Sequence, residues 1–162
     1  MRITEMSIIR ETDNTVKTKK EWAKNIDCDS CRCPHDVKFI MNNLFSLSKR
    51  TEEYLYLICL NAKNKIIGVF EISHGTDTCS VASIKGIILR ALLTACHSVI
   101  MVHNHPSGDF FPSTDDINTT KKTAALLNAY EVPLADHIII AGNDCYSFRE
   151  NNEELFEPVN IF

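Results

Sequence analysis

The feature that most limits the fold is a nearly wholly apolar run, "SVIMVH" (98–103), which lies between two stretches with helical spacing. A run this short and this apolar is typical of a strand buried on both faces of a sheet. Before it, residues 83–96 place apolar side chains on one helical face, and after it residues 114–130 predict another helix. Strands that alternate with helices indicate an α/β domain around a central sheet.

The preceding segment supports the same architecture. Residues 36–49 follow the spacing of an amphipathic helix. Two apolar runs, 53–60 and 65–73, are separated by the turn sequence "NAKN", which predicts a hairpin. A hairpin makes the sheet mixed, and two further strands are expected at 137–142 and 145–148.

These elements predict one α/β domain over residues 34–162, a central mixed β-sheet flanked by helices. Residues 1–33 are polar and mixed, and they indicate an N-terminal arm or extension with a short strand near 5–11. A chain of 162 residues is long enough for one domain with a sizeable core.

Charge argues mildly against a dedicated nucleic-acid binder. The formal net charge is −4 and the pI is about 5.8. The longest basic run, "KTKK" (17–20), is typical of a solvated face, and a broad basic footprint is missing from the sequence.

Localisation is expected to be cytoplasmic. The start "MRITEMSII" carries Glu5 where a signal peptide would need an apolar segment, and no apolar run is long enough to span a bilayer. The seven cysteines are therefore expected to be thiols. Four of them lie in or near apolar stretches and are expected in the core: Cys59, Cys79, Cys96 and Cys145.

The end of the central strand carries two histidines, His103 and His105, in "HNHPSGD". Residues i and i+2 of a strand point to one face, so both imidazoles can reach one point while Asn104 points away. Nitrogen ligands at a strand end suit zinc. The simpler interpretation, two polar residues at a strand end, stays open on this pattern alone.

The segment Ser113–Asp116 also allows two interpretations. Serine followed three residues later by an acid predicts a helix-capping box. A carboxylate in the first turn of that helix could also reach back to the histidines as a third ligand, leaving an open position for water. The two interpretations are compatible.

Together, His103-x-His105-Pro106 and Ser113-x-x-Asp116 resemble the metal motif of JAMM (MPN or JAB) metallohydrolases. The surrounding text "RALLTACHSVIMVHNHPSGD", with "DHIII" and "YSF", is similar to the RadC-like branch. The resemblance covers about 34–150, and implies a cytidine deaminase-like α/β fold with Zn²⁺ held at the sheet edge by His103, His105 and Asp116.

The resemblance also implies a catalytic glutamate just before the first core strand. Glu53 stands at the matching place as general base, and Glu71 is a rival. Ser113 is expected to donate a hydrogen bond to the developing oxyanion. The implied activity is that of a zinc-dependent hydrolase, a metallopeptidase acting on a peptide or isopeptide bond of a peptide or protein substrate.

Some features leave alternatives open. The repair-related name of the RadC family suggests a DNA-repair-associated factor that acts on or near DNA without peptidase activity. This chain has Ile84-Lys85-Gly86 where members usually carry Pro-Arg-Glu, which weakens a carried-over DNA role. The string H-N-H is not the signature of HNH nucleases, whose named residues are spread over a hairpin.

A second metal site is a further hypothesis. The segment "CDSCRCPH" offers four soft ligands for a structural zinc: Cys28, Cys31, Cys33 and His35. Three other histidines have no partner at metal spacing and are expected to be structural, with His137 near the edge of the site: His74, His97 and His137.

Overall fold

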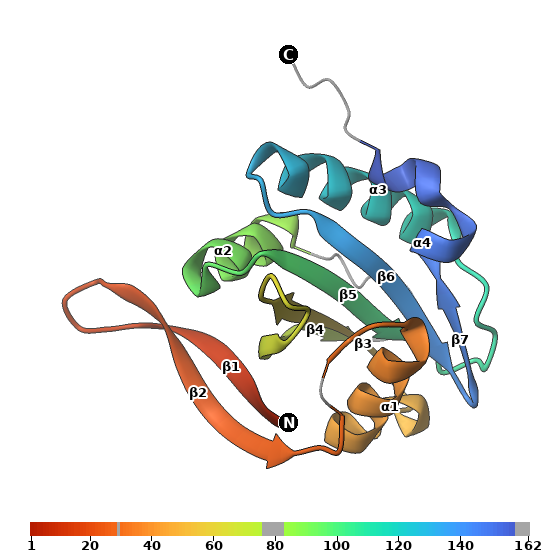
Figure 1. Ribbon diagram of the computed structural model, residues 1–162, viewed down its shortest axis with the longest axis horizontal. Coiled ribbons are helices and arrows are strands. Elements are labelled where there is room, and N and C mark those ends of the chain that lie inside the picture. Colours follow the sequence, from red (N-terminus) through yellow and green to blue (C-terminus); the bar gives the residue numbers. More distant parts are fainter. Residues whose placement is uncertain (29, 76–82, 158–162) are drawn as a thin grey trace.

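The computed structural model describes residues 1–28, 30–75 and 83–157 (Figure 1). Its strands are β1 (Arg2–Arg10), β2 (Val16–Asn25), β3 (Glu53–Leu60), β4 (Ile66–Gly75), β5 (Ser98–Asn104), β6 (Leu134–Ala141) and β7 (Asp144–Ser147). Its helices are α1 (Pro34–Phe45), α2 (Ile84–Thr94), α3 (Thr114–Ala129) and α4 (Phe148–Asn151), with 3-10 turns η1 (Leu47–Lys49) and η2 (Glu153–Phe156).

All the strands named above belong to one sheet, in the order β2-β1-β4-β3-β5-β6-β7. The pairs β1/β4 and β5/β6 are parallel, and the other neighbours are antiparallel. The predicted mixed sheet of a single α/β domain is therefore confirmed. Strand β5 lies between β3 and β6, and every one of its residues is buried, as its apolar run predicts.

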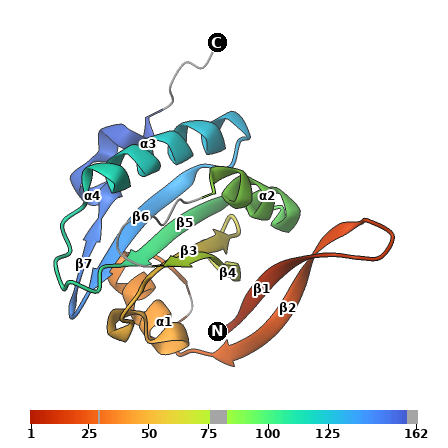
Figure 2. The ribbon, with the colours of Figure 1, turned by 180° about the vertical axis from the view of Figure 1, so that it is seen from behind.

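Helices cover both faces of this sheet (Figures 1 and 2). Helix α1 packs on the face that carries Ile58, Ile100 and Ile138. Helices α2 and α3 pack on the other face, which includes Leu57 and Met101. Alternate residues of β3, β5 and β6 therefore belong to two separate cores. Residues an even number of positions apart in a strand lie on the same face of the sheet.

Some boundaries differ from the prediction for local reasons. Helix α1 ends at Phe45 because Ser46 adopts a left-handed conformation, with φ of 52°, and its N–H bonds to the Asn42 carbonyl. Strand β6 begins at Leu134, three residues earlier than expected, because the buried Leu134 extends the pairing with β5. The short helix α4, capped by the Ser147 side chain, was not predicted.

The N-terminal residues form more structure than the predicted short strand. Strands β1 and β2 pair over their whole lengths, and β1 also pairs with β4, so the hairpin extends the sheet at one edge. Ile3 is fully buried in the α1-side core. The tip of the hairpin projects from the body of the domain (Figure 1). Strand β2 was missed because most of its residues are exposed, which leaves no apolar alternation to detect.

The expected core cysteines are only partly confirmed. Cys59 and Cys96 are buried and Cys145 is half-buried, whereas Cys79 lies outside the described residues. In the part of the chain that the structure describes, no helix is long and apolar enough to cross a membrane.

Candidate metal centre

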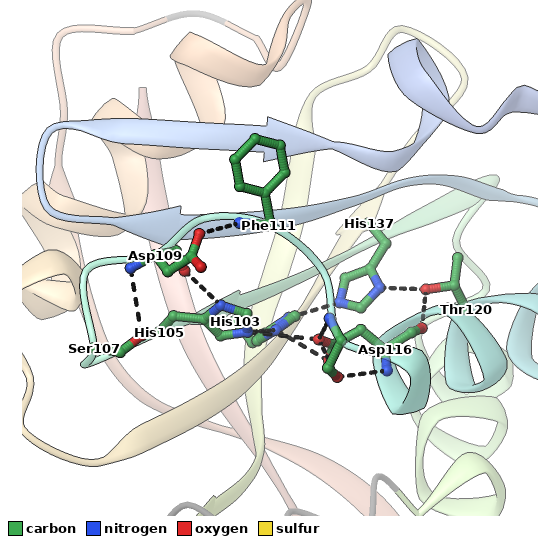
Figure 3. Close-up of polar contacts among 9 residues, drawn as sticks. His103, His105, Ser107, Asp109, Phe111, Asp116, Thr120 and His137 are labelled. Atoms are coloured by element: carbon green, nitrogen blue, oxygen red, sulfur yellow. Dashed lines mark hydrogen bonds and ion pairs between the residues drawn. The ribbon is translucent and has the colours of Figure 1, made fainter.

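Two histidine side chains meet at the end of β5. The Nε2 atoms of His103 and His105 lie 2.9 Å apart (Figure 3). His103 is buried and His105 is half-buried. The backbone N–H of His105 donates to the Ile140 carbonyl, which continues the pairing with β6 one residue beyond β5 and fixes the second imidazole. The predicted convergence of the two rings is present in the structure.

Helix α3 brings a carboxylate to the same point. Asp116 lies in the first turn of α3, with Oδ1 3.3 Å from His103 Nε2 and Oδ2 3.5 Å from His105 Nε2. One ligand atom from each of the three residues lies within 4.8 Å of the others. No other group of three or more histidine, cysteine or acidic side chains has metal spacing in residues 1–28, 30–75 and 83–157.

The capping box at the start of α3 is also present. The backbone N–H of Asp116 donates to Ser113 Oγ at 3.1 Å, and the backbone N–H of Ser113 donates to Asp116 Oδ2 at 2.8 Å. The Ser113 hydroxyl donates to the same Oδ2 at 2.6 Å. The cap therefore holds the Asp116 carboxylate in place. The Ser113 hydroxyl could donate to an oxyanion only after breaking this bond to Asp116. The expected role of Ser113 in stabilising an oxyanion stays a prediction.

The protonation of the cluster is set by mutual contacts. Burial alone would raise the pKa of Asp116, but its contacts with the imidazoles of His103 and His105 and the hydrogen bond from Ser113 outweigh burial and hold the pKa well below its usual range. The bond to Asp116 raises the pKa of His105, against the opposing effect of burial. Asp116 is thus ionised throughout the ordinary pH range.

The donor set fits a cation. His105 Nδ1 lies 2.7 Å from the Asp109 carbonyl, and a carbonyl only accepts, so Nδ1 must carry a proton. In the neutral ring the lone pair is then on Nε2, facing the Nε2 of His103 and the charged Asp116. The lone pair of His105 and the Asp116 carboxylate, which lie beside a second imidazole nitrogen, suit a positive charge between them. A proton on His105 supplies it at low pH, and a metal ion with nitrogen and oxygen ligands suits the same place.

Two residues behind His103 were not expected in the site. His103 Nδ1 lies 2.8 Å from His137 Nε2, and His137 Nδ1 lies 2.6 Å from Thr120 Oγ1 (Figure 3). Burial first, and then the charge of His103, lower the pKa of His137 well below its ordinary value. The prediction placed His137 near the site edge, and the structure places it in direct contact with the candidate ligand His103.

A sequence signal for these two residues existed. His137 pairs with Met101 in the parallel register of β5 and β6, two residues before His103 on the same face. Thr120 follows Asp116 by four residues, one turn along the same side of α3. His137 could be linked to His103 only once the pairing of β5 with β6 was known, and the sequence alone does not give that pairing.

The two candidate glutamates lie on opposite faces of the sheet. Glu53 begins β3, two residues before Leu55, which pairs with His103, so Glu53 is on the face of the ligands. Its charge contributes to the raised pKa of His105. Glu71 instead accepts from the Tyr56 hydroxyl at 3.4 Å, and Tyr56 is in the α1-side core. Glu71 also contacts His74 at 2.8 Å.

Asn104, between the two histidines, points to the backbone of β3. Its amide donates to the Glu52 carbonyl at 3.0 Å and accepts from the Tyr54 N–H at 2.9 Å. The side chain is 1% exposed. These two bonds bracket Glu53, so the residue that separates the ligands also fixes the chain on either side of the candidate base.

The segment that contains Cys28, Cys31, Cys33 and His35 does not form a ligand cluster in the described residues, from which Asp29 is left out. The Cys28 thiol donates to the Ser30 carbonyl at 3.2 Å. Burial, followed by the charges of Cys28 and Asp36, raises the pKa of Cys31 to about 12. A thiol must lose its proton to bind zinc, so this arrangement does not favour the second metal.

Comparisons with known proteins agree with this geometry. The family model of the RadC-like JAB domain matches residues 31–153. A UPF0758 protein of Chlorobaculum tepidum is 40% identical over 104 residues, covering 62% of this chain and 46% of that protein. Others are 35% identical over 129 residues in Caldanaerobacter subterraneus (79% and 54%) and 36% over 120 residues in Geobacillus thermodenitrificans (74% and 52%).

This chain spans about half the length of these curated relatives. The family model nevertheless covers most of the chain, from Cys31 to Glu153, and includes the three candidate ligand residues. The chain belongs to the RadC-like JAB domain family.

Proposed function

We propose that this protein is a zinc-dependent hydrolase of the JAMM type that cleaves a peptide or isopeptide bond. One observation carries the proposal: His103, His105 and Asp116 converge with their ligand atoms within 4.8 Å. Three protein ligands that leave a position open are the arrangement of catalytic rather than structural zinc sites. Membership of the JAB domain family supports the same reaction type.

The residues have separate tasks in this proposal. His103, His105 and Asp116 would hold the zinc, which supplies Lewis acidity and brings the pKa of a water molecule to about 7. Glu53 would take a proton from the attacking water as the oxygen of that water bonds to the carbonyl carbon of the substrate. Glu53 would then give this proton to the amine nitrogen as the C–N bond breaks.

The surroundings of the centre favour a peptide over a nucleic acid. The exposed carboxylates Asp109 and Asp115 lie in the loop and helix that carry the ligands, and they would repel a phosphate backbone. The ring of Phe111 is 64% exposed and stacks on Phe110 in the same loop. The exposed ring of Phe111, backed by Phe110, offers apolar contact to the side chains of a peptide.

The proposal is tested by incubating the zinc-loaded protein with a library of unstructured and isopeptide-linked peptides, with and without a chelator. We expect chelator-sensitive cleavage that Glu53→Gln abolishes while zinc content is unchanged. Glu71→Gln is the matched control, because Glu71 is engaged on the opposite face, and it should retain the activity.

DNA affinity, measured over a range of salt concentrations, is the second arm of this test. Tight, salt-sensitive binding of DNA without cleavage of any peptide would reverse the proposal in favour of a DNA-associated role.

A further inference from the structure

Behind the metal centre, hydrogen bonds form a continuous path through the core. The path leads from His103 Nδ1 to His137 Nε2 at 2.8 Å, and from His137 Nδ1 to Thr120 Oγ1 at 2.6 Å. It ends where the Thr120 hydroxyl donates to the backbone carbonyl of Asp116 at 2.6 Å. His137 and Thr120 are buried, at 2% and 0% exposure, so water does not compete for these bonds.

The proton positions follow from the last bond. A backbone carbonyl only accepts, so the single hydroxyl proton of Thr120 is directed to Asp116. The hydroxyl oxygen must then accept from His137, which places the proton of the neutral ring on Nδ1. His137 Nε2 therefore carries a lone pair and accepts the Nδ1 proton of His103. The lone pair of His103 is left on Nε2, which faces Asp116 and His105.

We propose that Thr120 and His137 are positioning residues that lock His103 in the tautomer whose Nε2 binds the metal. The path starts at one ligand residue and ends at the backbone of another, so it couples the tautomer of His103 to the placement of Asp116. Ligating histidines usually donate their second N–H to a carboxylate, a carbonyl or water. Here the neutral imidazole of His137 accepts the N–H of His103, and the Thr120 hydroxyl determines which nitrogen of His137 carries the proton.

The stacking of His137 explains how this relay, the path of hydrogen bonds from His103 through His137 and Thr120 to Asp116, is held in place. Its ring is parallel to that of Phe148, with centroids 4.8 Å apart and 8° between the planes. Phe148 is fully buried at the start of α4. The stack supports the ring in the orientation that directs Nε2 to His103 on β5 and Nδ1 to Thr120 on α3.

The inference rests on the proposed zinc site, and its test measures zinc affinity rather than activity. The variants are Thr120→Val, which keeps the shape but loses the hydroxyl, and Thr120→Ser, which keeps the hydroxyl. Zinc affinity is measured by competition with a chromophoric chelator. We expect Thr120→Val to bind zinc about tenfold or more weakly, in the range found for outer partners of metal ligands, and Thr120→Ser to stay near the wild-type affinity.

A spectroscopic measurement tests the proton positions directly. In metal-free protein labelled with ¹⁵N-histidine, long-range ¹H–¹⁵N spectra should show His103 and His137 each protonated at Nδ1. Thr120→Val should lose the single tautomer of His137, whereas Thr120→Ser should keep it. A wild-type His137 protonated at Nε2 would overturn the inference without reference to any variant.

A third variant guards against misfolding of Thr120→Val. His137→Phe keeps the stack on Phe148 but removes the acceptor of the His103 proton, so it should also weaken zinc binding. If wild-type protein binds zinc and both Thr120→Val and His137→Phe bind it equally well, the relay is wrong and the zinc site stands. If wild-type protein binds no zinc, the proposed function fails first, and the tautomers still decide whether the relay exists.

Discussion

At the scale of single residues, the proposed metal centre is a place where a proton and a metal ion would compete for His105. His105 has a raised pKa because Asp116 accepts its hydrogen bond, and Asp116 stays ionised because its contacts with His103, His105 and Ser113 lower its pKa. The metal-free protein therefore holds a proton on His105 below the raised pKa, and this proton must leave when the metal binds.

The apparent zinc affinity is therefore expected to fall as the pH is lowered through the raised pKa of His105. Above that pKa the affinity should level off, because the ligand is then already deprotonated. Asp116 contributes nothing to this slope, since it is ionised over the whole range. Chelator competition at a series of pH values measures the effect. An affinity unchanged between about pH 8 and about pH 5 would show that His105 is not a ligand.

At the scale of elements, the start of α3 combines a helix cap with a proposed metal ligand, Asp116. Ser113 accepts the backbone N–H of Asp116 and also donates to its carboxylate. Helix α2 has a comparable cap without a ligand, in which Ser83 accepts from the Gly86 N–H at 3.1 Å. A comparison of the two caps can therefore distinguish the contribution of a cap to stability from the contribution of Ser113 to holding Asp116.

Ser113→Ala is expected to lower the free energy of unfolding by about 1 kcal/mol, as for other lost N-caps, and also to weaken zinc binding. Ser83→Ala is expected to lower stability by a similar amount of about 1 kcal/mol while leaving zinc affinity unchanged. Urea denaturation of the metal-free proteins and chelator competition measure the two effects. Equal zinc affinities for the two variants would mean that the cap does not position the carboxylate.

The sequence predicted the elements whose apolar residues form a clear pattern. Strand β5 and the hairpin of β3 and β4 were predicted because they are short apolar runs, the latter two separated by a turn sequence, and helices α1 and α2 were predicted because their apolar residues follow helical spacing. The convergence of His103, His105 and Asp116 was predicted because residues i and i+2 of a strand share a face and Asp116 lies in the first turn of the next helix. His137 was missed as a site residue because its contact with His103 depends on the pairing of β5 with β6. Thr120 was missed because it reaches His103 only through His137.

At the scale of the whole molecule, the N-terminal hairpin belongs to the same sheet as the metal centre. Strand β1 pairs with β4, and Ile3 is fully buried in the core that includes Ile58 and Ile100 of β3 and β5. The predicted N-terminal arm is thus an integral edge of the domain. The hairpin should unfold together with the remainder of the sheet.

Ile3→Ala is therefore expected to lower the free energy of unfolding by about 2–5 kcal/mol, in one transition that also includes the β3–β5 region. Ile67→Ala, at a partly exposed position of β4, is the control and should cost less. Urea denaturation followed by circular dichroism and by hydrogen exchange of β5 amides measures the change. Loss of the hairpin without any effect on β5 would indicate an independent arm.

The most direct test of the account is the zinc content of the purified protein and of two neighbouring variants. We predict one zinc per chain in the wild-type protein and in Asp115→Asn, whose exposed side chain lies outside the centre, and loss of the metal in Asp116→Asn. One zinc per chain would also argue against a second site at the cysteine segment. Stoichiometric zinc in Asp116→Asn, or none in the wild-type protein, would contradict the central claim that His103, His105 and Asp116 form a metal centre.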